Sequence, residues 1–496
     1  MGFCGPASEL HILATSREPL GITGESIWQV PPLAIPDPRT PATLATVSGT
    51  EAVRLFTDRA RLALPDFRLS TANAAGVVRI CQQLDGVPLA LELAAARVRS
   101  LSIGEIAAHV SGSLELLVGG SRTAAPHQRT LQATLDWSYA LLEPDEQSLF
   151  EQSGVFAGGW ILEAAEVVCA EGIRPTNVVN LLARLVEKSL VLAEHRIDRR
   201  VRYRMLEVLR QYARDQLRKR DTASSPQRRH AEYFHRVIEG AGPELQPPHQ
   251  GWWLNWCHEE LDNLRAALDW AAESGNAGIS LRIAANMRRY WFHVHQNEGR
   301  SRLESLLALP SAAADITAQA DGLVALGMLT RERDELALAR SYGEKGLALA
   351  RAIGNPSGVF SALVTLSWTV AFQGEWDAAE QMLQECIDLA WKLGDLEVGL
   401  ALGGIGTLCV QQSRDDEARS ILEDSVDKLR AVGAYSNAAQ YLCILADIAL
   451  RQQQFEEADR HAADALSLAH GPRVRVGLGD EGARHSGTPG YGRTSI

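Results

Sequence analysis

The sequence predicts a mainly α-helical protein with a small amount of β structure, in which the C-terminal half is an α-solenoid of helical hairpins. Apolar residues recur at helical spacing through most of the 496 residues. The short apolar runs that predict strands lie before residue 206. A pattern of about 40 residues recurs between residues 334 and 470, which is typical of stacked helix pairs. Because the chain is too long for one hydrophobic core, we expect several domains.

Residues 1–125 are expected to hold part of an α/β domain and a helical subdomain. Leu10–Ser16 (LHILATS) predicts one buried strand, whose partner strands would have to come from elsewhere. A proline-rich connector follows. Helical periodicity then predicts three helices, over Glu51–Leu64, Asn73–Leu84 and Pro88–Val98.

Residues 126–220 are expected to form a second domain, with helices first and a hairpin after them. Thr130–Ala170 predicts two or three short helices, interrupted by the pair Gly158-Gly159. Asn177–Leu190 predicts a helix that runs into a strand, and Val201–Met205 predicts the second strand of the hairpin. Three helices followed by a hairpin is the order of a winged-helix domain.

A helix predicted over Leu206–Lys219 closes this domain, and the polar stretch Asp221–Gln227 predicts a linker. Residues 228–330 are expected to be a helical connector. A group of tryptophans in it predicts a helix-packing anchor, with a ligand pocket as the alternative. The tryptophans are Trp252, Trp253 and Trp256.

Residues 331–470 are expected to be tetratricopeptide-like repeats. Four alanines recur at spacings of 40, 39 and 40 residues, and a glycine follows fifteen residues after each of the first three. A small alanine lets two helices approach closely, and the glycine ends a helix. These residues are Ala339, Ala379, Ala418 and Ala458, with Gly354, Gly394 and Gly433. The glycine-rich stretch 471–496 is expected to be disordered.

Four segments of the chain together resemble one family of proteins. They are Ile12–Leu20 (ILATSREPL), Leu84–Ala96 (LDGVPLALELAAA), Thr130–Leu142 (TLQATLDWSYALL) with Val155–Gly159, and Tyr203–Leu217 (YRMLEVLRQYARDQL). In this order they resemble actinobacterial transcriptional regulators of the signal-transduction ATPase (LuxR-type) class. That resemblance implies an NB-ARC-like nucleotide-binding domain, a winged helix and tetratricopeptide-like repeats. Residues 1–125 would then be the C-terminal part of the nucleotide-binding domain with its helical subdomain.

The resemblance implies ADP or ATP as a ligand and suggests where it is contacted. Arg17 matches the family's sensor arginine near the terminal phosphate, where a guanidinium can distinguish triphosphate from diphosphate. Pro88, with Leu89, matches the adenine-side contact, because a proline at a helix start offers a rigid apolar surface. The plainer interpretations are a surface arginine and an ordinary helix-start proline. Leu206 stands where many relatives carry a histidine that approaches the diphosphate, and leucine cannot donate that hydrogen bond.

The sequence has no G-x-x-x-x-G-K-[ST] loop to hold phosphates. Without that loop and a carboxylate on Mg²⁺, phosphoryl transfer lacks its machinery, so we expect no catalytic residue, no metal site and no enzyme. The expectation is therefore an N-terminally truncated regulatory or scaffold protein of this family. Two alternatives stay open: an active ATP-hydrolysing switch, and a nonfunctional truncated gene product.

Composition and charge restrict the partners. The net charge of −12 disfavours nucleic acid unless a local basic patch exists, and Arg196–Arg229 is such a patch. However, the helix at the recognition position, Asn177–Ser189, offers only Arg184 and Lys188 as cations, which argues against direct DNA binding. No apolar run is long enough for a membrane helix, and seven scattered cysteines fit a reduced, cytoplasmic protein. We expect a protein or small effector to bind the repeats.

Overall fold

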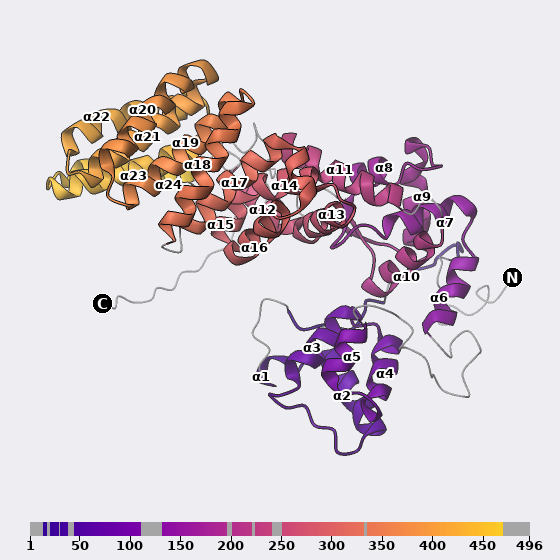
Figure 1. The fold of residues 1–496 in the computed structure, drawn as a ribbon. Helices are drawn as coiled ribbons and strands as arrows, with labels where there is room; N and C mark the ends of the chain where they lie inside the picture. The colour runs from indigo at the N-terminus through magenta and orange to yellow at the C-terminus, as the bar shows by residue number, and fades with distance from the viewer. Residues whose placement is uncertain are drawn as a thin grey trace. The chain divides into compact units, whose positions relative to one another are not determined.

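The computed structural model describes residues 13–16, 20–28, 30–37, 44–110, 131–195, 201–220, 224–240, 250–331 and 335–469. The chain divides into two compact units, and helices dominate the described part of both (Figure 1). The first unit comprises residues 1–242 and 254–329, and the second comprises residues 243–253 and 330–496.

The first helices of unit 1 form a small bundle. Helix α2 packs on α4, and α3 packs on α5, around buried side chains such as Phe56, Ile80 and Leu91. Glu51 in the first turn of α2 accepts a hydrogen bond from Ala34 N (3.0 Å), which ties the preceding segment to the helix. The helices are α1 (Leu44–Val47), α2 (Glu51–Ala63), α3 (Ala74–Gln83), α4 (Pro88–Ala96), the short 3-10 turn η1 (Arg97–Arg99) and α5 (Ile103–Val110).

The predicted strand Leu10–Ser16 is wrong over its described part. Leu13–Ser16 has no strand structure, and the Leu13 side chain is 96% exposed. A single buried strand needs hydrogen-bonded neighbours. Among the described residues, strands occur only in the next domain, so this segment has none to pair with.

Residues 131–220 form helices around a three-stranded antiparallel sheet with the strand order β1-β3-β2. Ala193 of β2 and Trp160 of β1 both stand opposite Tyr203 of β3. Helix α7 begins with a capping box between Glu143 and Glu146. The elements are α6 (Leu131–Ala140), α7 (Pro144–Ser153), β1 (Trp160–Ile161), α8 (Leu162–Val168), α9 (Pro175–Glu187), β2 (Leu192–His195), β3 (Val201–Arg204) and α10 (Glu207–Arg218).

Strand β1 was not predicted from the sequence because it is only two residues long. It follows Gly158 and Gly159, which adopt φ values of +79° and +102°. A Cβ on Gly159 would lie 2.7 Å from the carbonyl oxygen of Tyr203, so β1 can approach β3 only because this residue is glycine. The helices and hairpin predicted for a winged-helix domain are otherwise present.

Helices continue through the connector. The predicted linker Asp221–Gln227 is wrong at its C-terminal end, because α11 already begins at Ser224. Pro226 lies in the first turn, where the missing N–H costs no helical hydrogen bond. Two of the three tryptophans pack as predicted for an anchor: Trp253 is buried, and the ring of Trp256 lies 6.5 Å from that of Phe234. The elements are α11 (Ser224–Gly240), α12 (Gln250–Glu259), α13 (Leu261–Glu273), α14 (Ala277–Asn286), α15 (Arg288–His293), α16 (Gln296–Leu307), η4 (Pro310–Ala314) and α17 (Ile316–Arg331).

Unit 2 is a series of antiparallel helix pairs of nearly equal length, as the repeat predicts (Figure 1). The four repeat alanines are buried, and the three glycines that follow helices have positive φ. Ion pairs join successive hairpins: Arg351 to Glu385 (2.6 Å), Arg414 to Glu380 (3.1 Å) and Arg430 to Asp464 (2.8 Å). The helices are α18 (Leu336–Ala352), α19 (Pro356–Phe372), α20 (Trp376–Leu393), α21 (Asp395–Gln411), α22 (Asp415–Ala431), α23 (Tyr435–Arg451) and α24 (Phe455–Ala469). Residues 471–496, predicted to be disordered, lie outside the described residues.

Candidate functional site

The residues predicted to contact a nucleotide are only partly described. Arg17 lies outside the described residues. Pro88 is the first residue of α4 and is exposed, and Leu89 beside it is half-buried. The preceding turn is fixed by a hydrogen bond from Leu33 N to the carbonyl oxygen of Gly86 (3.1 Å). Proline thus starts the helix here, and its role toward a base stays a prediction.

The turn before Pro88 contacts the start of α10. The Asp85 carboxylate accepts a hydrogen bond from Glu207 N and lies 3.8 Å from the guanidinium of Arg204. A cavity of about 330 Å³ lies here, lined by Asp85, Glu207 and Asp262 and by two arginines, Arg204 and Arg210. A diphosphate would therefore meet more negative than positive charge in this cavity. These residues do not fit the phosphates of a nucleotide.

The exposed face of α9, which occupies the recognition position, is poorly suited to reading bases. Its buried side holds Val178, Leu181, Leu182 and Leu185. The exposed side chains are Val179, Asn180, Ala183, Arg184 and Glu187. Arg184 and Lys188 both pair with Glu146, at 3.9 and 2.7 Å. Major-groove recognition needs free polar groups aimed at base edges, and this face offers few.

Most of the described arginines of the predicted basic patch pair with carboxylates, some of them buried and some at the surface. Six arginines between the start of β3 and the middle of α11 each pair with a carboxylate. The pairs are Arg202–Glu260, Arg204–Asp85, Arg210–Glu207, Arg218–Asp215, Arg220–Glu151 and Arg229–Glu171. Because these charges are already paired, the sequence overstates the basic character of the surface.

The Arg202–Glu260 pair is the most buried of these, with side chains 6% and 8% exposed and a separation of 2.5 Å. Arg202 also donates to the carbonyl oxygen of Gly159 (3.2 Å), and Asn263 of α13 donates to the same oxygen (2.8 Å). Burial lowers the pKa of Arg202, but the hydrogen bonds and charge of Glu260 outweigh burial and raise it overall. This network joins the winged helix to the connector.

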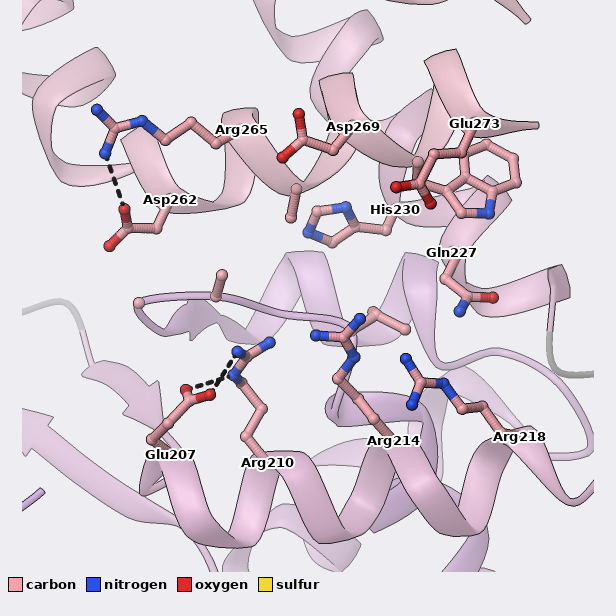
Figure 2. Close-up of a pocket in the computed structure, with 15 residues that line it drawn as sticks. Glu207, Arg210, Arg214, Arg218, Gln227, His230, Asp262, Arg265, Asp269 and Glu273 are labelled. Atoms are coloured by element: carbon pink, nitrogen blue, oxygen red, sulfur yellow. Dashed lines mark hydrogen bonds and ion pairs between the residues drawn. The ribbon is translucent and has the colours of Figure 1, made fainter. Parts of the chain in front are cut away.

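A larger cavity of about 740 Å³ lies between α10 on one side and α11 and α13 on the other (Figure 2). We call it the junction pocket. Arg210, Arg214 and Arg218 project into it from α10, and the carboxylates of Asp262, Asp269 and Glu273 come from α13 (Figure 2). The remaining lining residues are Val155, Ala157, Gly158, Glu207, Gln227, His230, Arg265, Ala266 and Trp270.

Arg214 differs from the arginines on either side of it. Arg210 makes a bidentate pair with Glu207 (2.7 Å to each oxygen), and Arg218 pairs with Asp215 (3.2 Å). Within the part of the chain that the structure describes, the Arg214 guanidinium has no hydrogen-bond or ion-pair partner. Burial lowers the pKa of Arg214, and the charges of Arg210 and Arg218 lower it further. An anion beside it would relieve that repulsion.

Sequence reasoning noticed these arginines but considered them only as contacts to DNA. The spacing of four residues, which places all three on one helix face, could have indicated a shared surface. The acidic residues of α13 have spacings of seven and four, which also place them on one face. That these two faces meet could not be read from the sequence, because the helices are separated by more than 40 residues.

One group of possible metal ligands lies elsewhere, in unit 2. Oxygen and nitrogen atoms of Glu423, Glu457 and His461 lie within 4.8 Å of one another. Glu457 is already paired with Arg419 and Arg460, both at 3.2 Å, so its charge is compensated without a metal. We assign no metal to it. Among the described helices, none combines the length and apolar character needed to cross a bilayer.

Comparison with known proteins identifies one domain family and several related sequences. The winged helix-turn-helix domain family matches residues 142–218, which run from the start of α7 to the end of α10. The chain is 36% identical over 442 residues to a protein of Mycobacterium tuberculosis named as an HTH-type transcriptional regulator, covering 86% of this chain and 48% of that one. It is 25% identical over 447 residues to the regulatory protein AfsR of Streptomyces griseus, covering 86% and 41%.

Among solved structures, the chain is similar to a signal transduction ATPase with numerous domains from Pyrococcus horikoshii, which has a tetratricopeptide repeat sensor. The identity is 13% and the TM-score 0.35, over 86% of this chain and 67% of that one. The chain spans about half the length of the curated relatives it matches, and those that are 36% identical to it are named as HTH-type transcriptional regulators.

Proposed function

We propose that this chain is the regulatory part of a transcriptional regulator, in which the winged helix connects domains instead of reading DNA and the solenoid binds a protein or small effector. The observation that carries the proposal is the internal pairing of the winged-helix arginines, above all Arg202 with Glu260. A buried pair holds a helix–strand junction in place, whereas a DNA reader needs its cations free for phosphates. The names of the relatives support a role in transcription.

Exposed apolar side chains support effector binding by the solenoid. Several large ones stand on its helices, namely Phe372, Trp391, Leu450, Phe455 and Leu466. Lys428 lies 5.1 Å from the Trp391 ring centre, a cation–π arrangement that leaves the ring accessible. Aromatic side chains that remain exposed on a repeat surface are common binding anchors.

DNA binding tests the first half of the proposal. Fluorescence anisotropy with a mixed-sequence duplex should give a dissociation constant weaker than about 100 μM at physiological salt, the weak end of nonspecific binding. Arg184→Gln should leave the titration unchanged. Submicromolar binding that Arg184→Gln weakens would show instead that α9 contacts DNA.

Regulated transcription tests the second half. In a strain that expresses the full-length regulator, Trp391→Ala should reduce the effect of the regulator on the transcript levels of its target genes, because it removes an exposed side chain that contacts the effector. Lys392→Ala, at the neighbouring exposed position, is the matched control. Equal behaviour of the two variants would exclude this solenoid surface as the binding site.

We further propose that this chain alone neither holds a nucleotide tightly nor hydrolyses ATP. The negative lining beside Asp85 supports this, and the role is then regulatory and not enzymatic. Calorimetry with ADP should show no binding tighter than about 100 μM, near −5.5 kcal/mol. Micromolar affinity, or turnover that Arg17→Ala abolishes, would contradict the proposal.

A further inference from the structure

The two sides of the junction pocket carry opposite charge over a similar length. Arg210, Arg214 and Arg218 are four residues apart on α10, so each lies about 6 Å along the helix from the next. On α13, the carboxylates of Asp262, Asp269 and Glu273 span eleven residues, or about 16 Å. Figure 2 shows the two rows facing each other, with Gln227 and His230 between them. The pocket therefore has an arginine-rich side and a carboxylate-rich side, although most of these charges are paired.

The total charge of the lining is zero. Four arginines and four carboxylates line the pocket: Arg210, Arg214, Arg218 and Arg265 with Glu207, Asp262, Asp269 and Glu273. A polyanion such as a nucleotide would gain from the α10 side and lose on the α13 side. A ligand with both charges, separated along its length, would gain on both sides.

Two charged groups of the lining, the half-buried Arg214 and the exposed Glu273, lack an ion pair within the described residues. Arg214 on α10 and Glu273 on α13 make no ion pair or hydrogen bond there. The side-chain oxygen of Gln227 is buried and accepts no hydrogen bond. In contrast, Asp269 pairs with Arg302 at 2.6 Å. A bound molecule would thus meet one unpaired guanidinium and one unpaired carboxylate, whereas the buried oxygen of Gln227 is out of its reach.

We propose that the junction pocket binds a zwitterion of the amino-acid class, a free amino acid or a short peptide with free termini, with its carboxylate on Arg214 and its ammonium on Glu273. The volume of about 740 Å³ lies within the usual range for small-molecule sites. The pocket is formed wholly by unit 1, so the proposal does not depend on what the solenoid binds.

Equilibrium dialysis of the full chain tests the proposal. The probes are a synthetic tetrapeptide library with free termini, the same library N-acetylated, the same library C-amidated, and a mixture of the free amino acids. Mass spectrometry should find members of the free-termini library or the amino-acid mixture enriched with the protein. Which of the two is enriched identifies the source. Blocking either terminus of the bound peptide should weaken binding by about tenfold or more, the usual loss for a hydrogen bond to a charged group.

Matched substitutions assign the two ends of the ligand. With Arg214→Gln, the free-acid and amidated forms should bind equally, and with Glu273→Gln the free-amine and acetylated forms should bind equally. For a free amino acid, its amide and N-acetyl derivatives replace the blocked libraries. Arg228→Gln is the control, because Arg228 lies on α11 outside the lining and pairs loosely with Glu232 (4.0 Å). Thermal melts confirm that each variant is folded.

Three results would overturn the proposal. The first is no enrichment from any probe. The second is equal enrichment of the free and doubly blocked ligands. The third is binding of inorganic phosphate or ATP that depends on Arg214 without any enrichment of peptide or amino acid, which would indicate a simple anion site.

Discussion

At the scale of single residues, charged groups taken out of water decide much of the behaviour of unit 1. Arg202 and Glu260 are both nearly inaccessible, whereas the side chains of Arg218 and Asp215 are 61% and 49% exposed. The two pairs are the same in chemistry and differ in burial. Their energies should therefore differ several-fold.

Glu260→Gln should strongly destabilise unit 1, because it leaves the buried charge of Arg202 without a counter-ion. We expect a loss of about 3–5 kcal/mol in the free energy of unfolding. Asp215→Asn, which breaks the exposed pair, should cost less than about 1 kcal/mol. Urea unfolding followed by tryptophan fluorescence measures both. Similar losses in the two variants would mean that Arg202 is solvated in solution.

His230 makes the stability of unit 1 depend on pH. The pKa of His230 is lowered from 6.5 to about 4, mainly by burial and further by the charge of Arg210, with a hydrogen bond to Asn263 (3.3 Å) acting in the opposite direction. Between pH 6.5 and about 4, His230 is therefore protonated in the unfolded chain and neutral in the folded chain. Stability should fall as the pH decreases from 6.5 to about 4, by on the order of 2–3 kcal/mol from this residue.

His230→Gln removes that proton and should flatten this part of the curve. The measurement is the urea midpoint at several pH values between 8 and 4. At pH 8 the histidine is neutral in both states, so any difference between variant and parent there reports packing and the hydrogen bond with Asn263. Parallel curves for the two proteins would show that His230 is not the responsible group.

Residue-scale prediction from sequence had a clear limit here. The arginines of the stretch Arg196–Arg229 were visible, but their partners Glu260, Glu151 and Asp85 lie up to about 120 residues away along the chain. Charge pairing over such separations has no local pattern. A basic run therefore predicted a patch where the fold makes internal ion pairs.

At the scale of elements, apolar periodicity predicted helices well, because a helix makes its backbone hydrogen bonds within itself. The helices α2, α3 and α4 lie within two residues of their predicted bounds. The strand Leu10–Ser16 was wrong, because a strand depends on neighbours that no local pattern reveals. Strand β1 was missed for a different reason, because two residues cannot show an alternating pattern. In the pocket, α10 was predicted as a single helix and α11 and α13 only as part of a helical connector, and their facing sides were not predicted.

The repeat register makes a prediction at this scale. Ala379 is fully buried where α20 packs on its neighbours, so Ala379→Leu should overpack the contact and cost about 1–3 kcal/mol. Ala378 is half-buried and points about 100° away around the helix, so Ala378→Leu should cost clearly less. Hydrogen exchange of the α20 amides in the full chain measures the two. Equal effects would contradict the register.

At the scale of the whole molecule, the segment before the first helix differs from the rest. Residues 20–28 and 30–37 have no helix or strand, yet Ile22, Ile27, Trp28 and Val30 are each more than 60% exposed. Apolar side chains on exposed coil are accessible to a protease, which needs an extended backbone. The solenoid also exposes apolar side chains, but on regular helices.

Limited chymotrypsin treatment should therefore cut after Trp28 before it cuts after Trp391. Trp391 is 63% exposed, close to the 79% of Trp28, but it lies within α20, where cleavage requires local unfolding. Mass spectrometry of the first products decides the order. Early cleavage after Trp391 would mean that α20 opens readily, against the packing described for the solenoid.

The ion pairs between successive hairpins give the solenoid an adjustable stiffness. The packing of helices at the buried alanines does not depend on charge, so salt does not weaken the contact within each repeat. The ion pairs of Arg351, Arg414 and Arg430 join successive hairpins and oppose changes in the angle between them. Salt shortens the Debye length from about 10 Å at 0.1 M to about 3 Å at 1 M, which weakens these ion pairs and leaves the helix packing unchanged. The array should therefore flex more in concentrated salt without unfolding, so that ionic strength sets how far a partner can bend it.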